Sequence, residues 1–220
     1  MNPDSENLFK YLDQTRQLYG NQLFVERVRK KAFESSNGDL DSFYQSICTC
    51  QKCPLGKTRN NFVFGVGNPH ADIVFVGEAP GKQEDLQGVP FVGRAGKLLD
   101  KILAAIDLTR EDVYICNVLK CRPPNNRDPL PLEVEQCEPF LINQLHLINP
   151  ILIVALGRIS ACTLLKTKES LKNLRNRIFK YAGIDLLVTY HPAALLRNPN
   201  FKKPTWDDFQ LIREKYLLRQ

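Results

Sequence analysis

The chain has 220 residues, and 43% of them are hydrophobic, which is enough to bury one sizeable core. Its 30 basic and 24 acidic side chains give a formal net charge of +6, which suits a polyanionic partner. No apolar run has transmembrane length and no basic-then-apolar leader stands at the start, so the sequence argues against a membrane protein, and we expect an intracellular, cytoplasmic one.

Residues 1–45 are predicted to form a helical amino-terminal extension that precedes a single domain over residues 46–220. The extension is rich in charged and amide side chains, and its apolar residues recur at roughly helical spacing, beginning with Leu8 and Leu12. A Ser-Ser-Asn-Gly-Asp linker follows at residues 35–39. The pattern therefore predicts one or two amphipathic helices, but it does not indicate what they do.

Seven cysteines in a chain without a leader argue against a disulfide framework and for thiols or metal ligands. Three of them form a C-x-C-x-x-C motif at Cys48, Cys50 and Cys53, and two more follow at Cys121 and Cys137. A C-x-x-C turn alone fits a redox pair or half a zinc site equally well. One close pair plus two distant cysteines looks less like zinc and suits an iron–sulfur cluster. Cys50 and Cys53 are favoured over Cys48 because their spacing is the usual turn geometry.

Four apolar runs are predicted to be buried β-strands, because each is rich in β-branched residues and is followed by a polar motif. They span residues 71–76, 113–118, 151–156 and 186–190. Helical patterns lie between them at about 95–106, 132–149 and 160–165, and another follows at 205–218. In the second of these, Pro139 indicates a bend or a late helix start just after Cys137. This alternation favours a parallel sheet, whose geometry would bring all four polar loops to one edge.

The loop after the first predicted strand carries three carboxylates among glycines, at Glu78, Glu84 and Asp85. Ligands bind at this edge of open α/β sheets, so the loop is a candidate catalytic loop. A solvated acidic turn is the alternative. Residues 88–95 look like a phosphate-binding loop, but Arg-Ala stands where Lys and Ser/Thr are required, which argues against nucleoside triphosphate binding.

Four groups of motifs, most of them directly after predicted strands, follow one another along the chain. They are Gly77-Glu78-Ala79-Pro80-Gly81 with Glu84-Asp85, Pro90-Phe91-Val92-Gly93-Arg94, Asn117-Val118 with Lys120-Cys121-Arg122-Pro123-Pro124 and Asn126-Arg127, and His191-Pro192-Ala193-Ala194. With the cysteine layout, they resemble the family 4 uracil-DNA glycosylases, the iron–sulfur members of their superfamily, over roughly residues 48–200.

The resemblance implies a three-layer α/β/α fold with a central four-stranded parallel sheet. It implies a [4Fe–4S] cluster, whose ligands would be Cys50, Cys53, Cys121 and Cys137. The implied activity is hydrolysis of the bond between uracil and deoxyribose in DNA, which leaves an abasic site and initiates base excision repair.

The resemblance also implies which residues hold the base. Phe91 would stack on the flipped ring. The amide of Asn117 would match O4 and N3–H of uracil and mismatch cytosine. His191 would donate a hydrogen bond to the departing uracil oxygen. Gly77 and Ala79 would complete the substrate-binding motif.

The attacking water needs a carboxylate, and related families place an Asp where this chain has Ala79. Glu78 is therefore the first choice to orient the water, with Glu84 and Asp85 as second choices. The loop from Gly81 to Asp85 is expected to exclude thymine by bulk near its C5 position.

For DNA itself, Leu195 matches the wedge position whose side chain would fill the stack left by an extruded base. Basic residues in the same loops are candidates for phosphate contacts: Arg94, Lys120, Arg122, Arg127 and Arg197. Uracil-containing DNA is thus the expected partner. The protein is expected to act as a monomer, with a replication or repair protein as a further candidate partner.

Two alternatives remain open. An iron–sulfur protein that binds DNA or uracil without excision activity would bind its ligand and release no base. A related glycosylase would excise another deaminated base. A relative that traps the sugar covalently is discounted, because no basic, His-containing insertion stands between Arg127 and Leu132.

Overall fold

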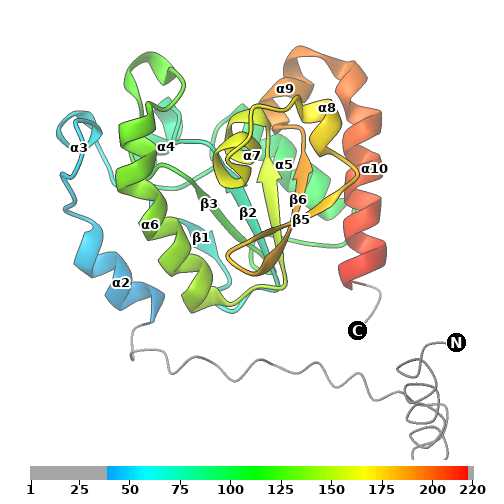
Figure 1. The fold of residues 1–220 in the computed structure, drawn as a ribbon, viewed down its shortest axis with the longest axis horizontal. Coiled ribbons are helices and arrows are strands. Elements are labelled where there is room, and N and C mark those ends of the chain that lie inside the picture. The colour runs from blue at the N-terminus through cyan, green and yellow to red at the C-terminus, as the bar shows by residue number, and fades with distance from the viewer. Residues whose placement is uncertain (1–38, 218–220) are drawn as a thin grey trace, which may run out of the picture. The chain divides into compact units, whose positions relative to one another are not determined.

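A six-stranded mixed sheet lies at the centre of the part of the chain that the computed structural model describes, residues 39–217 (Figure 1). The strands are β1 Val66–Gly67, β2 Ile73–Gly77, β3 Tyr114–Asn117, β4 Leu152–Leu156, β5 Ile178–Tyr181 and β6 Ile184–Thr189. Their order is β1-β3-β2-β4-β6-β5. The four middle strands are parallel, which confirms the predicted central sheet, and the edge strands are antiparallel to their neighbours.

The sequence analysis predicts neither edge strand, because both lack the continuous apolar run of a strand that is covered on both faces. Strand β1 is two residues long and follows directly on Gly65. Strand β5 alternates exposed and half-buried side chains. It joins β6 through a hairpin whose turn residues, Ala182 and Gly183, have φ values of 50° and 81°.

Helices cover both faces of the sheet, as the predicted three-layer fold requires. The α-helices are α2 Leu40–Ile47, α3 Leu55–Thr58, α4 Lys82–Gln87, α5 Arg94–Ala104, α6 Pro131–Ile148, α7 Arg158–Leu165, α8 Leu171–Leu174, α9 Pro192–Arg197 and α10 Lys202–Ile212. The other helical segments are the 3-10 turns η1 Pro124–Asn126 and η2 Pro199–Phe201 and the π-helical segment η3 Arg213–Leu217.

Strand β2 shows how its alternating side chains divide the core into two layers. Val74 and Val76 belong to the cluster that includes Leu141 of α6, whereas Phe75 belongs to the cluster that includes Leu99 of α5 and Phe209 of α10. The Phe75 and Phe209 rings stack with centroids 5.9 Å apart. Side chains therefore pack on both faces of the sheet that carries the loops at its edge.

Helix α6 matches the helical pattern predicted at about 132–149, without the late start that was one of the two interpretations of Pro139. Pro131 starts the helix, so the late start after Cys137 is wrong, and Pro139 lies within the helix. Proline is well tolerated at a first helical position because its missing N–H would be unpaired there anyway. Glu133 strengthens this start by accepting a hydrogen bond from the Leu130 amide at 2.8 Å.

Helix α2 packs on the domain core, since Leu40 and Ile47 are buried and the Phe43 ring lies 5.8 Å from that of Phe64. The predicted boundary between extension and domain falls inside this helix. The helices predicted from the pattern that begins at Leu8 lie outside the described residues. Among residues 39–217, no helix is both long and apolar enough to cross a membrane.

Candidate functional site

The loops that follow β2, β3, β4 and β6 line one cleft of about 660 Å³. This volume is in the range of small-ligand sites. The lining comes from the stretches 78–81, 123–128, 156–159 and 190–197, together with single residues such as Phe91 and Asn117. The predicted convergence of four loops at one edge of the sheet is confirmed.

Gly77, the last residue of β2, allows two predicted base-binding side chains to meet. A Cβ atom at this position would lie 2.3 Å from Asn117 Oδ1 and 2.7 Å from Phe91 Cζ. Both side chains therefore pack where any other residue would place its own Cβ. The Phe91 ring also faces His191, with ring centroids 5.5 Å apart and planes tilted by 31°. Phe91, Asn117 and His191 thus lie together in the cleft.

The hydrogen bonding of His191 determines which ring nitrogen carries the proton. His191 is the N-cap of α9, and its Nδ1 accepts a hydrogen bond from the Ala193 amide at 3.1 Å. A neutral ring that accepts at Nδ1 carries its proton on Nε2. Burial, and secondarily the charge of Arg197, lowers the pKa of His191 to about 4. At neutral pH this side chain is therefore an uncharged Nε2–H donor.

Gly157 lies against His191. Its φ is +91°, in a region that favours glycine, and a Cβ there would lie 2.8 Å from His191 Cβ. The turn after β4 thus leaves room for the backbone and Cβ of His191.

Glu78 lines the cleft directly after β2. Burial raises the pKa of its carboxyl to about 7, with a further contribution from Asp128, while Arg158 acts in the opposite direction. A carboxyl that is half ionised near neutral pH is suited to proton transfer.

The other two predicted carboxylates lie on α4 and bind backbone or side-chain amides. Glu84 lines the cleft, but its Oε1 accepts hydrogen bonds from the Val92 and Gly93 amides at 3.0 and 2.9 Å. Asp85 is only 2% exposed, does not line the cleft, and accepts from the Asn60 backbone N and Nδ2 at 2.9 and 2.5 Å. This placement contradicts the expectation that Asp85 orients the water.

Lys120 is not a phosphate contact, contrary to prediction. It is 0% exposed, and its Nζ donates to the Asn117 carbonyl at 2.8 Å and to Gln144 Oε1 at 2.5 Å. These two acceptors give the buried amino group hydrogen-bond partners, while burial lowers its pKa. Lys120 therefore braces the segment that carries Asn117.

The other predicted basic residues remain at the surface or at the cleft. Arg94 and Arg197 are exposed, and Arg122 donates to Asn126 Oδ1 at 2.8 Å. Arg127 lines the cleft and forms a two-point ion pair with Glu133, with N–O distances of 2.6 and 2.9 Å.

The predicted wedge is also misplaced, because Leu195 is only 3% exposed and belongs to the interior. The next residue, Leu196, is 44% exposed. Both are apolar residues of the short helix α9, so the sequence alone did not indicate which one faces outward.

Arg158, Tyr190 and Phe201 are among the cleft residues that the sequence analysis did not predict as site residues. Arg158 lines the cleft next to Gly157, and the stacked rings of Tyr190 and Phe201 lie at its edge with centroids 4.3 Å apart. Arg158 follows the glycine that ends the β4 run, and Tyr190 directly precedes His191. These positions next to strand ends could have identified both residues as candidates for the cleft.

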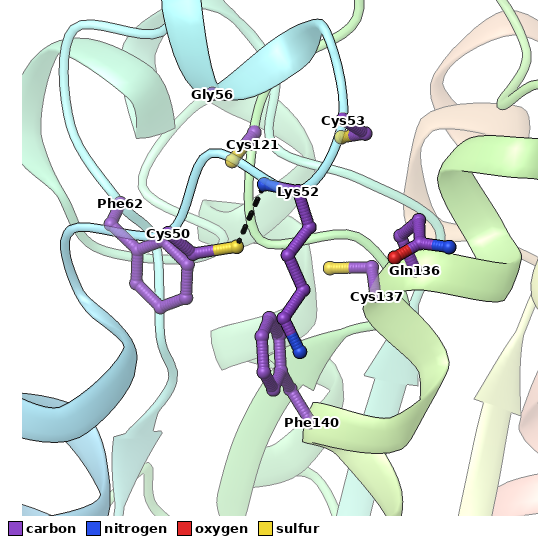
Figure 2. A pocket seen from close by; sticks show the side chains of 9 residues that line it. All are labelled: Cys50, Lys52, Cys53, Gly56, Phe62, Cys121, Gln136, Cys137 and Phe140. Atoms are coloured by element: carbon purple, nitrogen blue, oxygen red, sulfur yellow. Dashed lines mark hydrogen bonds between the residues drawn. The ribbon is translucent and has the colours of Figure 1, made fainter.

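A second, smaller cavity is lined by four cysteines: Cys50, Cys53, Cys121 and Cys137. Figure 2 shows the sulfur atoms of Cys50 and Cys137 pointing toward one another across it. Cys48 is not part of this lining, and its thiol donates to the Gln45 carbonyl at 3.6 Å. Within residues 39–217, no three Cys, His, Asp or Glu side chains are grouped as ligands of a single metal ion.

Hydrogen-bond donors face three of these thiols. Arg59 Nη1 lies 3.1 Å from Cys121 Sγ, and the Lys120 backbone N lies 3.3 Å from Cys137 Sγ. The Lys52 backbone N lies 3.5 Å from Cys50 Sγ (Figure 2). Such donors favour the thiolate form that binds metal, whereas burial raises the pKa of the Cys121 and Cys137 thiols. The cavity therefore has the donor set of a thiolate-ligated centre.

Comparison with known proteins agrees with this geometry. Residues 64–210 match the family model of the uracil DNA glycosylase superfamily. A type-4 uracil-DNA glycosylase from Archaeoglobus fulgidus is 48% identical over 80% of this chain and 92% of that protein. One from Saccharolobus solfataricus is 46% identical over 80% and 86%, and one from Thermotoga maritima is 50% identical over 70% and 81%, respectively. The chain therefore belongs to the uracil DNA glycosylase superfamily, and within it to the type-4 family.

Proposed function

We propose that this protein hydrolyses the N-glycosidic bond of uracil in DNA, leaves an abasic site and thereby initiates base excision repair. The observation that carries the proposal is the meeting of Phe91, Asn117 and His191 in one cleft, over the bare backbone of Gly77. An aromatic face, an amide and an uncharged imidazole donor are the groups that one extruded pyrimidine needs.

Base recognition rests on Phe91 and Asn117. A base inside a duplex is unreachable, so it must leave the stack and enter the cleft. There the Phe91 ring stacks on it, and the Asn117 amide offers an N–H to O4 and an oxygen to N3–H of uracil. Cytosine presents the reverse pattern at this edge, so it would leave buried polar groups unpaired.

His191 assists departure of the base. Breaking the bond places negative charge on uracil and positive charge on the sugar, as in other glycosyl transfers. The neutral Nε2–H of His191 donates a hydrogen bond to the uracil oxygen where charge develops. Because Nδ1 is held by the Ala193 amide, the ring is oriented before the substrate arrives.

Glu78 orients the attacking water and offsets the charge of the sugar. It is the first carboxylate after β2 and lies in the cleft, whereas Glu84 and Asp85 already accept hydrogen bonds from other parts of the fold. We assign Glu84 and Asp85 to positioning: Glu84 holds the segment after Phe91, and Asp85 holds the segment at Asn60.

We propose that the four-cysteine cavity holds a [4Fe–4S] cluster. The thiols that line it and the donors that face them support this assignment. When bound, the cluster supplies a covalent link between the segment before α3, the loop after β3 and helix α6. Catalysis is carried by the residues of the cleft.

DNA contacts come from the rim of the cleft. Leu196 replaces Leu195 as the wedge, because it is the exposed leucine of α9. Phosphates are held by the basic residues at or near the rim: Arg94, Arg122, Arg127, Arg158 and Arg197.

The test is incubation of the purified protein with a uracil-containing oligonucleotide, followed by alkaline cleavage at abasic sites. We expect strand scission with uracil and none with thymine or cytosine. Binding without scission would instead indicate a non-catalytic binder, and scission at another deaminated base alone would indicate a different glycosylase.

A further inference from the structure

The backbone of Phe91 has an unusual conformation for an aromatic residue. Its φ is 55°, in the left-handed region that residues other than glycine and asparagine seldom occupy. A residue stays in such a conformation only when its surroundings hold it there, and residues of this kind cluster at functional sites. The question is therefore which groups hold Phe91.

Arg110, in the loop between α5 and β3, binds the backbone of Phe91 directly. Its Nη2 donates to the Phe91 carbonyl, and its Nη1 donates to the Pro90 carbonyl at 3.1 Å. Asp100 of α5 accepts from Arg110 Nε at 2.6 Å and so orients the guanidinium. One planar group thus holds two successive carbonyls in a fixed geometry, which a lysine ammonium does not reproduce.

Two further features hold the same residue from other sides. Glu84 accepts from the Val92 and Gly93 amides, the two donors that follow Phe91. Gly96 makes room, because a Cβ at that position would lie 1.7 Å from the Phe91 carbonyl oxygen. The carbonyl side and the amide side of the Phe91 turn are therefore both bound by side chains from separate elements.

We propose that Arg110 is a positioning residue for base stacking: it holds Phe91 in its left-handed conformation, so that the ring stays over Gly77 and beside His191 before uracil enters. This inference rests on the proposed function. Without the guanidinium, the Pro90 and Phe91 carbonyls lose their partner, and Phe91 relaxes toward the extended region and carries its ring away. Base binding must then reorder the turn, so substrate affinity falls.

The experiment is a double-mutant cycle on uracil release, with Arg110→Ala, Phe91→Ala and the double variant. Arg110→Ala is expected to lower kcat/KM about tenfold or more, since small misplacements of a site are costly. In the Phe91→Ala background the same change should cost less than about twofold, because the two act through one ring. Inhibition by free uracil, which reports base binding without DNA, should weaken in parallel.

Arg213→Ala is the matched control. Arg213 also pairs with an aspartate of the segment between α5 and β3, Asp107 at 2.8 Å, but it makes no contact with Phe91. This variant removes one surface cation and should leave kcat/KM and uracil inhibition unchanged. If Arg110→Ala unfolds the protein, Asp100→Asn loosens the guanidinium without removing it and should show a smaller loss that also disappears in the Phe91→Ala background.

The inference is overturned if the effects of the Arg110 and Phe91 changes multiply, or if Arg110→Ala lowers only the unfolding temperature and leaves uracil inhibition intact. Failure of the wild-type protein to release uracil would instead reject the proposed function. The two failures are thus distinguishable.

Discussion

His191 illustrates how a single hydrogen bond sets the chemistry of a residue. Because Nδ1 accepts from the Ala193 amide, the proton must be on Nε2, the nitrogen that we assign to the leaving base. Burial keeps the ring neutral, with its pKa lowered to about 4. The neutral ring therefore keeps an Nε2–H that can donate a hydrogen bond to the negative charge developing on the base.

Replacement of His191 tests this role. His191→Ala should lower kcat for uracil release about 10²–10³-fold, the usual cost of removing a donor aimed at developing charge. His191→Gln keeps an N–H within reach of the base, so its kcat should lie between those of the wild type and His191→Ala. Single-turnover assays on a uracil oligonucleotide measure both, and undiminished scission in His191→Ala would remove this residue from the mechanism.

Glu78 should give the reaction its pH dependence. Because its pKa is raised to about 7, the carboxylate form is completed only above that pH, so log kcat should rise up to about pH 7 and then level off. Glu78→Gln should remove this limb and lower kcat about 10²-fold or more. A pH profile of single-turnover rates from pH 5 to 9 checks it, and Glu111→Gln, an exposed position, serves as control.

Glu78 should also make stability depend on pH, in the opposite direction: kcat rises with pH, whereas the free energy of unfolding falls. Between the ordinary pKa of 4.5 and the raised value of about 7, the folded chain binds a proton at Glu78 that the unfolded chain has released. The contribution of Glu78 to the free energy of unfolding therefore falls as pH rises through this window. Glu78→Gln should thus raise the melting temperature at pH 8 relative to the wild type, and by less at pH 5. A lower melting temperature at pH 8 would contradict this assignment.

At the scale of elements, the short helix α9 presents one leucine to the core and the next to solvent. Leu196→Ala should lower activity on duplex DNA about tenfold and on single-stranded DNA less than about twofold, because only a duplex leaves a stack to fill. Leu86→Ala is the control, since this leucine of α4 is 52% exposed and lies outside the cleft lining. Equal losses on both substrates would reject the wedge.

Individual elements also show how far the sequence reaches. The four middle strands and the meeting of their loops followed from apolar runs that end in polar motifs. The sequence misassigned Lys120 and Asp85, because a charge in a loop motif looks the same whether it faces solvent or a buried carbonyl. Arg110 gave no signal, since its target is the backbone of a residue from a different loop.

At the scale of the molecule, the cysteine cavity should determine stability. Cys137→Ser should lose iron and visible absorbance and lower the melting temperature on the order of 10 °C, because metal binding contributes to folding. Cys48→Ser should keep iron, colour and melting temperature, since Cys48 lies outside the cavity lining. Iron analysis and thermal unfolding measure both, and stoichiometric zinc in the wild type would overturn the cluster.

The segment from Asn117 to Cys121 connects the cleft to the cysteine cavity. Asn117 ends β3, Cys121 follows in the same loop, and Lys120 between them is anchored to Gln144 of α6, the helix that also carries Cys137. Because Lys120 Nζ binds both the Asn117 carbonyl and Gln144, we expect a shift of the segment at Cys121 to move the Asn117 amide that we assign to base recognition. Loss of the proposed cluster through iron starvation or oxidation is therefore expected to weaken discrimination between uracil and other pyrimidines before the protein unfolds.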